Sequence, residues 1–215
     1  YDIPVFLAEK PDLLSRPPMA LVTNALEAVR NHFRYEDLFS CLKTGLAGLD
    51  WDEIDKLENY VLTWNIRGGA WEREWTEHPD GYGLSIDENA KAQLAELNIL
   101  RKRAIAPFSA LREALAGEQP AGDCVRALYA FLLAVDAPQR MIDRAAGHEQ
   151  AGRLQLADEY RQLWEILVSA MEQFAWVCGD MPLTLDRFAQ LFRLVLGEYD
   201  VCLLYTSPSP RDTER

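Results

Sequence analysis

The sequence predicts a mainly α-helical protein, built as a helical bundle. Three observations lead to this fold class. Apolar residues recur every three or four positions through most of the chain, which is the period of one face of an α-helix. Capping residues and glycine or proline stops divide these stretches into helices of ordinary length. Only residues 3–7 (IPVFL) form a convincing β-type run, so little strand is expected.

The run at residues 3–7 is expected to be a short strand. A single strand leaves its backbone hydrogen-bonding groups unpaired unless neighbouring strands are present. The run therefore implies a sheet whose other strands are not evident in this sequence. Pro17 and Pro18 then suit the first turn of a helix, whose apolar positions continue to about residue 31.

Residues 35–69 are expected to form two short helices joined by a turn. Gly45 is the expected left-handed stop of the first helix. Asp50, followed three residues later by Glu53, has the pattern of a capping box that begins the second helix. We expect that helix to end at the glycine pair at 68–69. For any single residue in this hairpin, packing in the core is the favoured interpretation.

Five more helices are expected after a loop at residues 78–83. Pro107 should bend the long helix at 87–116 or split it in two, because proline removes a backbone donor. A loop is expected at 117–122. The remaining helices are expected at 125–133, 141–147, 154–178 and 185–197, with Thr184 as the N-cap and Gly197 as the stop of the last one.

The composition is that of an ordinary globular protein. Of the 215 residues 49% are hydrophobic and 26% are charged, and no apolar run is long enough to cross a membrane. The formal net charge of −12 argues against a free-standing nucleic-acid-binding domain, because lysine and arginine supply most of the affinity for phosphates. Any contact with DNA must therefore be local.

The candidates for local DNA contact lie in and after the hairpin. They are Lys43, Arg67 and Arg73, with Trp71 offering a ring on which a base could stack. For the tryptophans between residues 64 and 75, packing of the loop onto the bundle is the favoured alternative, because few basic residues are interleaved with them. The basic run at 101–103 is interpreted as a solvated helix face.

No metal site and no catalytic residue are assigned. The histidines lack metal-ligand spacing, and no G-x-x-x-x-G-K-[ST] loop is present to bind ATP phosphates. The cysteines are interpreted as small buried hydrophobic residues in a reducing compartment. They are widely scattered and form no C-x-x-C pair: Cys41, Cys124, Cys178 and Cys202.

Several short motifs resemble one known family. KTGL at 43–46, DEIDKLENYVL at 52–62, IRG at 66–68 and then Trp71 occur in an order and spacing similar to those of the AddB family. AddB is the B subunit of AddAB, a bacterial ATP-dependent helicase/deoxyribonuclease and a functional counterpart of RecBCD. Later motifs extend the resemblance to roughly residues 1–201: ALY at 127–129, EY at 159–160, Trp164, GD at 179–180 and L-x-x-F at 185–188.

The resemblance implies a division of the chain into three parts. Residues 1–34 would be a strand and a helix remaining from a RecA-like α/β helicase domain. Residues 35–201 would be a helical accessory or insertion domain. Residues 202–215 depart from the family pattern, and CLLYTSPSPRD within them reads like a translated sequencing adapter. We expect that tail to be non-native.

The resemblance also implies a function. The chain would be a non-catalytic internal part of a helicase–nuclease subunit that processes double-strand DNA breaks for recombinational repair. Its implied partners are an AddA-type subunit, in a heterodimer, and double- and single-stranded DNA, with no membrane. ATP, Mg²⁺ and a 4Fe–4S cluster are implied for the family but are expected to bind outside this chain. The expected location is the bacterial cytoplasm, in association with the nucleoid.

A second hypothesis comes from a different functional class. The chain would be an acidic, all-α adaptor that binds a partner protein through grooves between amphipathic helices and has no role in DNA processing. A helical-repeat scaffold is disfavoured, because no period of 30 to 50 residues repeats along the chain.

Overall fold

The structure is a computed structural model that describes the backbone of residues 13–206 and the side chains of residues 13–199. The strand expected at residues 3–7 and most of the expected non-native tail lie outside the described residues. Within them the protein is mainly α-helical, with eight α-helices, two short 3-10 helices and one two-stranded sheet. The predicted fold class is confirmed. The elements in chain order are η1 (Leu13–Ser15), α1 (Pro17–Arg30), α2 (Tyr35–Leu42), α3 (Trp51–Trp64), η2 (Gly68–Trp71), α4 (Glu88–Ala114), β1 (Glu118–Pro120), α5 (Ala121–Ala134), α6 (Ala137–Gln150), α7 (Leu154–Cys178), β2 (Pro182–Thr184) and α8 (Leu185–Thr206).

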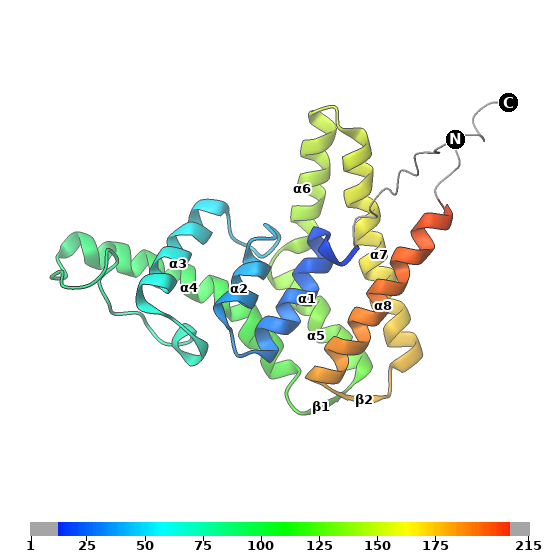
Figure 1. Cartoon of the computed structure of the whole chain (residues 1–215), viewed down its shortest axis with the longest axis horizontal. Coiled ribbons are helices and arrows are strands. Elements are labelled where there is room, and N and C mark those ends of the chain that lie inside the picture. Colours follow the sequence, from blue (N-terminus) through cyan, green and yellow to red (C-terminus); the bar gives the residue numbers. More distant parts are fainter. Residues whose placement is uncertain (1–12, 207–215) are drawn as a thin grey trace, which may run out of the picture.

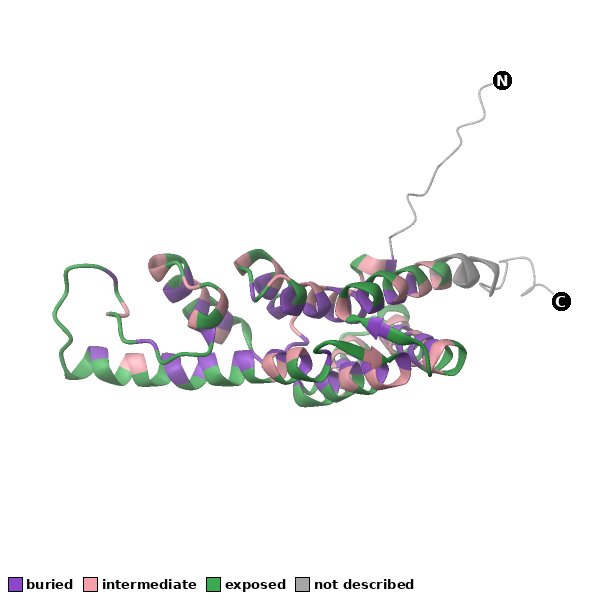
Figure 2. Cartoon of the chain, turned by 90° about the horizontal axis from the view of Figure 1, so that it is seen from below, coloured by how far each residue is buried: buried purple, intermediate pink, exposed green. Residues whose placement is uncertain are grey.

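The helices form an elongated body (Figure 1). At one end lie α3, the start of α4 and the loop between them, and at the other end lie α5, α7 and α8. Between these ends α1 packs against α2, α4, α7 and α8. The hairpin of α6 and the first half of α7 projects to one side. Buried residues concentrate on the sides of the helices that face one another (Figure 2).

One continuous hydrophobic core runs through the described body. It begins at Leu13 and continues to Leu196. Its C-terminal part contains three phenylalanines from α7 and α8, since Phe188 lies 5.5 Å from Phe174 and 5.6 Å from Phe192 between ring centroids. Edge-to-face and offset aromatic pairs of this kind contribute beyond the area they bury. This cluster joins α8 to the bundle.

Several helix boundaries follow the sequence signals closely. Two prolines stand in the first turn of α1, and α7 covers the predicted residues 154–178. Asp50 and Glu53 form a complete capping box at the start of α3, with the Asp50 carboxylate accepting from the Glu53 amide at 2.9 Å. In return Glu53 accepts from the Asp50 amide at 3.0 Å. Gly45 has the expected left-handed conformation, with φ of 69°, but it lies in the turn after α2, which already ends at Leu42.

The predicted loop at 117–122 is wrong. Residues Glu118–Pro120 form β1, which pairs in antiparallel register with β2, so that Gln119 faces Leu183. The prediction failed because a strand of three residues is too short to show an alternating pattern, and because its partner strand comes from a distant part of the sequence. The small sheet joins the start of α5 to the start of α8.

Two predicted helix ends also need correction. Helix α3 ends at Trp64 and not at the glycine pair, and its C-cap Asn65 adopts the left-handed conformation. Helix α8 continues through Gly197, because packing of Leu196 and Tyr199 against the core offsets the roughly 1 kcal/mol that a helical glycine costs. Of the two expected effects of Pro107, a split is absent, since this residue lies inside a continuous α4. The bend stays a prediction.

The hairpin expected at residues 35–69 is only partly confirmed. Both helices are present, but α2 packs more extensively against α1 than against α3, and α3 packs against α4. The helix predicted at 141–147 is present but longer, since α6 spans the 14 residues Ala137–Gln150.

Candidate nucleic-acid interface

The candidate DNA-contacting residues come from three neighbouring segments. Lys43 directly follows α2, Arg67 directly precedes η2, and Trp71 ends η2. The ring of Phe39 in α2 links two of them, since the Lys43 Nζ lies 6.0 Å and the Trp71 ring 6.1 Å from its centroid. Arg73 follows in the loop, where its Nε donates to the Gly69 carbonyl at 3.4 Å.

Lys43 is held in an ion pair with Glu58. The Lys43 Nζ donates to Glu58 Oε1 at 2.6 Å, and the Tyr35 hydroxyl donates to the same oxygen at 2.6 Å. Burial acts to raise the pKa of Glu58, but the hydrogen bonds from Lys43 and Tyr35 outweigh it and lower that pKa. The bond to Glu58 and burial together raise the pKa of Tyr35 to about 12. The charge of Lys43 is therefore neutralised within the protein.

Trp71 lies in the core. Its side chain is fully buried, and its ring packs 5.4 Å from that of Trp75, which is also buried. Trp75 in turn stacks on Tyr60 with centroids 4.6 Å apart. In this arrangement no face of the Trp71 indole is open to a base. Trp71 and Trp75 therefore pack the loop onto the bundle, which is the favoured alternative for these tryptophans.

A buried polar cluster made of Asn98 and Arg101 fastens this loop to α4. The Asn98 amide pairs with the Trp75 backbone in both directions, with the side-chain Oδ1 accepting and the Nδ2 donating at 2.9 Å each. Arg101 donates from Nε to Asn98 Oδ1 at 3.0 Å and from Nη1 to the Trp71 carbonyl at 2.6 Å. Burial lowers the pKa of Arg101.

The interpretation of residues 101–103 as a solvated face is thus wrong for Arg101, whose exposed fraction is 3%. The sequence did not reveal the structural role of Arg101, because its hydrogen-bond acceptor, the Trp71 carbonyl, lies far away along the chain. Lys102 is exposed, and Arg103 forms an ion pair with Glu53 at the start of α3. A signal was available in Asn98, a polar residue on the apolar face of the expected helix.

Arg67 and Arg73 remain as exposed cations. Arg67 lines a cavity of about 280 Å³ between the start of α2 and the end of α3. The sequence did not single out Arg34, which lies far from Arg67 along the chain and reaches the same cavity through the fold. The complete lining consists of Arg34, Tyr35, Glu36, Val61, Leu62, Asn65, Ile66 and Arg67.

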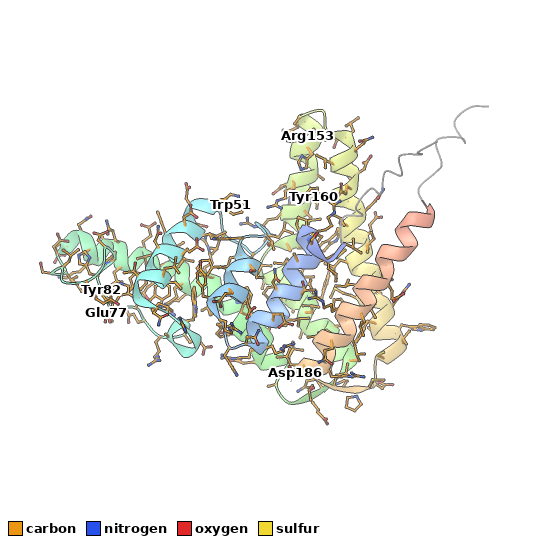
Figure 3. The ribbon with its side chains drawn as sticks, in the orientation of Figure 1. Trp51, Glu77, Tyr82, Arg153, Tyr160 and Asp186 are labelled. Carbon is orange, nitrogen blue, oxygen red and sulfur yellow. The ribbon has the colours of Figure 1, made fainter. Side chains whose placement is uncertain are left out.

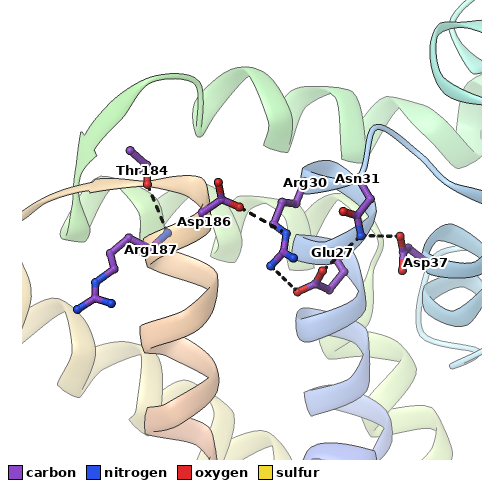
Figure 4. Close-up of polar contacts among 7 residues, drawn as sticks. All are labelled: Glu27, Arg30, Asn31, Asp37, Thr184, Asp186 and Arg187. Carbon is purple, nitrogen blue, oxygen red and sulfur yellow. Dashed lines mark hydrogen bonds and ion pairs between the residues drawn. The ribbon is translucent and has the colours of Figure 1, made fainter.

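Elsewhere, many basic side chains are already paired with carboxylates. Figure 4 shows Arg30 placed between Asp186, at 3.4 Å, and Glu27, at 3.2 Å. Arg153 lies at the tip of the projecting hairpin of α6 and α7, far from Tyr82 in the loop before α4 (Figure 3). Carboxylates therefore neutralise several of the basic side chains of the described residues.

The described part of the chain offers no group of three or more His, Cys, Asp or Glu side chains placed to hold a metal ion. Cys41 and Cys124 are buried, and burial raises the pKa of each thiol. Among the described helices none has the length and apolar character needed to span a membrane.

No protein-family model matches the chain. Its sequence is similar to three bacterial proteins, each named as the B subunit of an ATP-dependent helicase/deoxyribonuclease. The protein of Acetivibrio thermocellus is 33% identical over 211 residues, or 96% of this chain, and that of Clostridioides difficile is 33% identical over 206 residues, or 95%. The protein of Ruminiclostridium cellulolyticum is 34% identical over 208 residues, or 94%. The chain spans 18% of the length of each relative. Over nearly its whole length, the chain is thus a relative of the B subunits of ATP-dependent helicase/deoxyribonucleases.

Proposed function

We propose that this chain is a non-catalytic part of a helicase–nuclease subunit that processes double-strand DNA breaks for recombinational repair. The observation that carries the proposal is its similarity, along about 95% of its residues, to proteins named as B subunits of ATP-dependent helicase/deoxyribonucleases. A protein named as one subunit of an enzyme works with another, and for this partner we propose an AddA-type helicase–nuclease subunit in the bacterial cytoplasm.

The role that we propose for this chain is to shape the path of a DNA strand. Arg67 and Arg73 are exposed near the junction of α3 and η2. The net charge of −12 would repel DNA from most of the remaining surface. A few exposed cations on an acidic body favour a contact that guides a strand locally over one that grips it along its length.

We propose that ATP, Mg²⁺ and a 4Fe–4S cluster are bound by parts of the subunit outside this chain. The sequence carries no G-x-x-x-x-G-K-[ST] loop, which is the motif that surrounds ATP phosphates. Iron–sulfur clusters need thiolate ligands, whereas burial raises the pKa of Cys41 and Cys124 and so favours the neutral thiol. These two cysteines suit the core better than a cluster.

The DNA-path role is tested by equilibrium binding of the purified chain to labelled single-stranded and duplex oligonucleotides over a series of salt concentrations. We expect weak binding, with a Kd on the order of 10 µM or higher at physiological salt, that weakens as salt rises. Absence of binding at low salt, with the helical fold intact by circular dichroism, would contradict the proposal.

The adaptor hypothesis is favoured by a separate feature, an apolar groove of about 490 Å³ between α5 and α7. Val125 and Met171 form part of its floor, and Tyr129 and Leu133 are exposed at 43% and 53%. A chain that acted only as an adaptor would show no salt-dependent binding to DNA, so the same measurement separates the two functions.

A further inference from the structure

The cavity at the start of α2 and the end of α3 combines cationic and apolar walls. Arg34 and Arg67 supply guanidinium groups, and Val61, Leu62 and Ile66 supply apolar surface. Its volume of about 280 Å³ is near the lower limit for small-molecule sites. A cavity of this size suits one nucleotide unit and excludes a duplex.

The guanidinium of Arg67 is available to a ligand. Arg67 is exposed, and none of the ion pairs found among the described residues involves it. Arg34 has one weak partner, Glu36, whose carboxylate lies 3.8 Å from its Nε. A guanidinium can donate two parallel hydrogen bonds to a phosphate, which makes arginine the preferred residue for such recognition.

The backbone that carries Arg67 is fixed. Asn65 ends α3 in the left-handed conformation, and the Ile66 amide donates to the Val61 carbonyl at 3.0 Å. Ile66 packs against the core, so Arg67 leaves a closed turn and not a free loop. A fixed backbone reduces the conformational entropy lost when the side chain binds a ligand.

We propose that this cavity holds one nucleotide of a DNA single strand, with the phosphate between Arg34 and Arg67 and the sugar and base against Leu62 and Ile66. The inference rests on the proposed DNA-path role and gives it a specific site. Glu36 also lines the cavity and repels a phosphate, which keeps the affinity low enough for a strand to move on.

The test is fluorescence anisotropy of the whole chain with a 5′-labelled 12-residue oligothymidylate over a series of salt concentrations. Arg67→Gln is expected to raise the Kd about tenfold and to reduce the salt slope by about 0.7, the value for one phosphate contact to a single strand. Glu36→Gln is expected to lower the Kd several-fold, because it removes a repulsive charge and releases Arg34. This gain cannot result from misfolding.

Lys102→Gln is the matched control, since Lys102 is an exposed cation of α4 outside the cavity lining. If the chain binds the oligonucleotide but Arg67→Gln behaves like Lys102→Gln, the cavity proposal is overturned and the DNA-path role stands. If the chain does not bind at all, both are overturned. Displacement of the oligonucleotide by an equal concentration of inorganic phosphate would show a free-anion site and would also overturn the proposal of a strand site.

Discussion

Replacing Asn98 with alanine removes the side chain that fastens the loop after η2 to α4. Three buried groups lose a hydrogen bond at once: the Trp75 amide, the Trp75 carbonyl and the Arg101 Nε. Asn98 itself is 8% exposed and Trp75 is 4% exposed, so water does not reach these groups easily. Alanine offers no replacement donor or acceptor.

The expected loss in the free energy of unfolding is about 3 kcal/mol. Each buried polar group left without a partner costs roughly 1 to 3 kcal/mol, and local relaxation reduces the sum of three such costs. The measurement is urea unfolding followed by tryptophan fluorescence, because Trp71 and Trp75 both lie beside the buried polar cluster. The midpoint should fall while the slope stays the same.

Asn59→Ala is the matched control, because Asn59 is exposed on α3 and its side chain forms none of the hydrogen bonds found there. Its effect should stay within about 0.5 kcal/mol. If Asn98→Ala destabilises the chain no more than Asn59→Ala does, then the cluster does not hold the loop, and our account of Arg101 is refuted.

Three further predictions concern the capping box, the ion pair of Lys43 and the aromatic core. Asp50→Ala should lower the free energy of unfolding by about 1 kcal/mol and Asp55→Ala by much less, and equal melting temperatures for the two variants would contradict this. Partial burial acts to raise the pKa of Glu58, but the hydrogen bonds that Glu58 accepts outweigh it and lower that pKa. The contribution of Glu58 to stability is therefore complete above its ordinary pKa of 4.5 and is lost as pH falls through the lowered value. Lys43→Met should therefore flatten the loss of stability below about pH 4.5, and an unchanged pH profile by urea unfolding would oppose that assignment. Phe188→Ala should cost about 3 to 5 kcal/mol in chemical unfolding, because Phe188 is fully buried between Phe174 and Phe192, and a cost below about 1 kcal/mol would show that α8 is loosely packed.

The sequence was most informative where a helix is specified by its own residues. The capping box of α3, the prolines of α1 and the apolar stripe of α7 each act within a few residues, and all three predictions are confirmed. Predictions failed where distant residues decide the structure. The sheet needs β1 and β2 together, and Gly197 stays helical because α8 packs on the core.

The candidate site shows the same limit. Composition and charge indicated a few candidate cations around α2 and α3. The spacing of residues in the sequence does not distinguish an exposed arginine from a paired or buried one. The structure places Lys43 in an ion pair, Trp71 in the core and Arg67 at an open cavity. Contact of these residues with DNA stays a prediction.

We propose that this chain guides DNA without performing the chemistry. The most direct measurement is ATP hydrolysis and strand cleavage by the purified chain, incubated with linear duplex DNA, ATP and Mg²⁺. We expect neither activity above a control without protein, together with salt-dependent binding of single-stranded DNA. Turnover of ATP or DNA that follows the chain through purification would contradict a non-catalytic role.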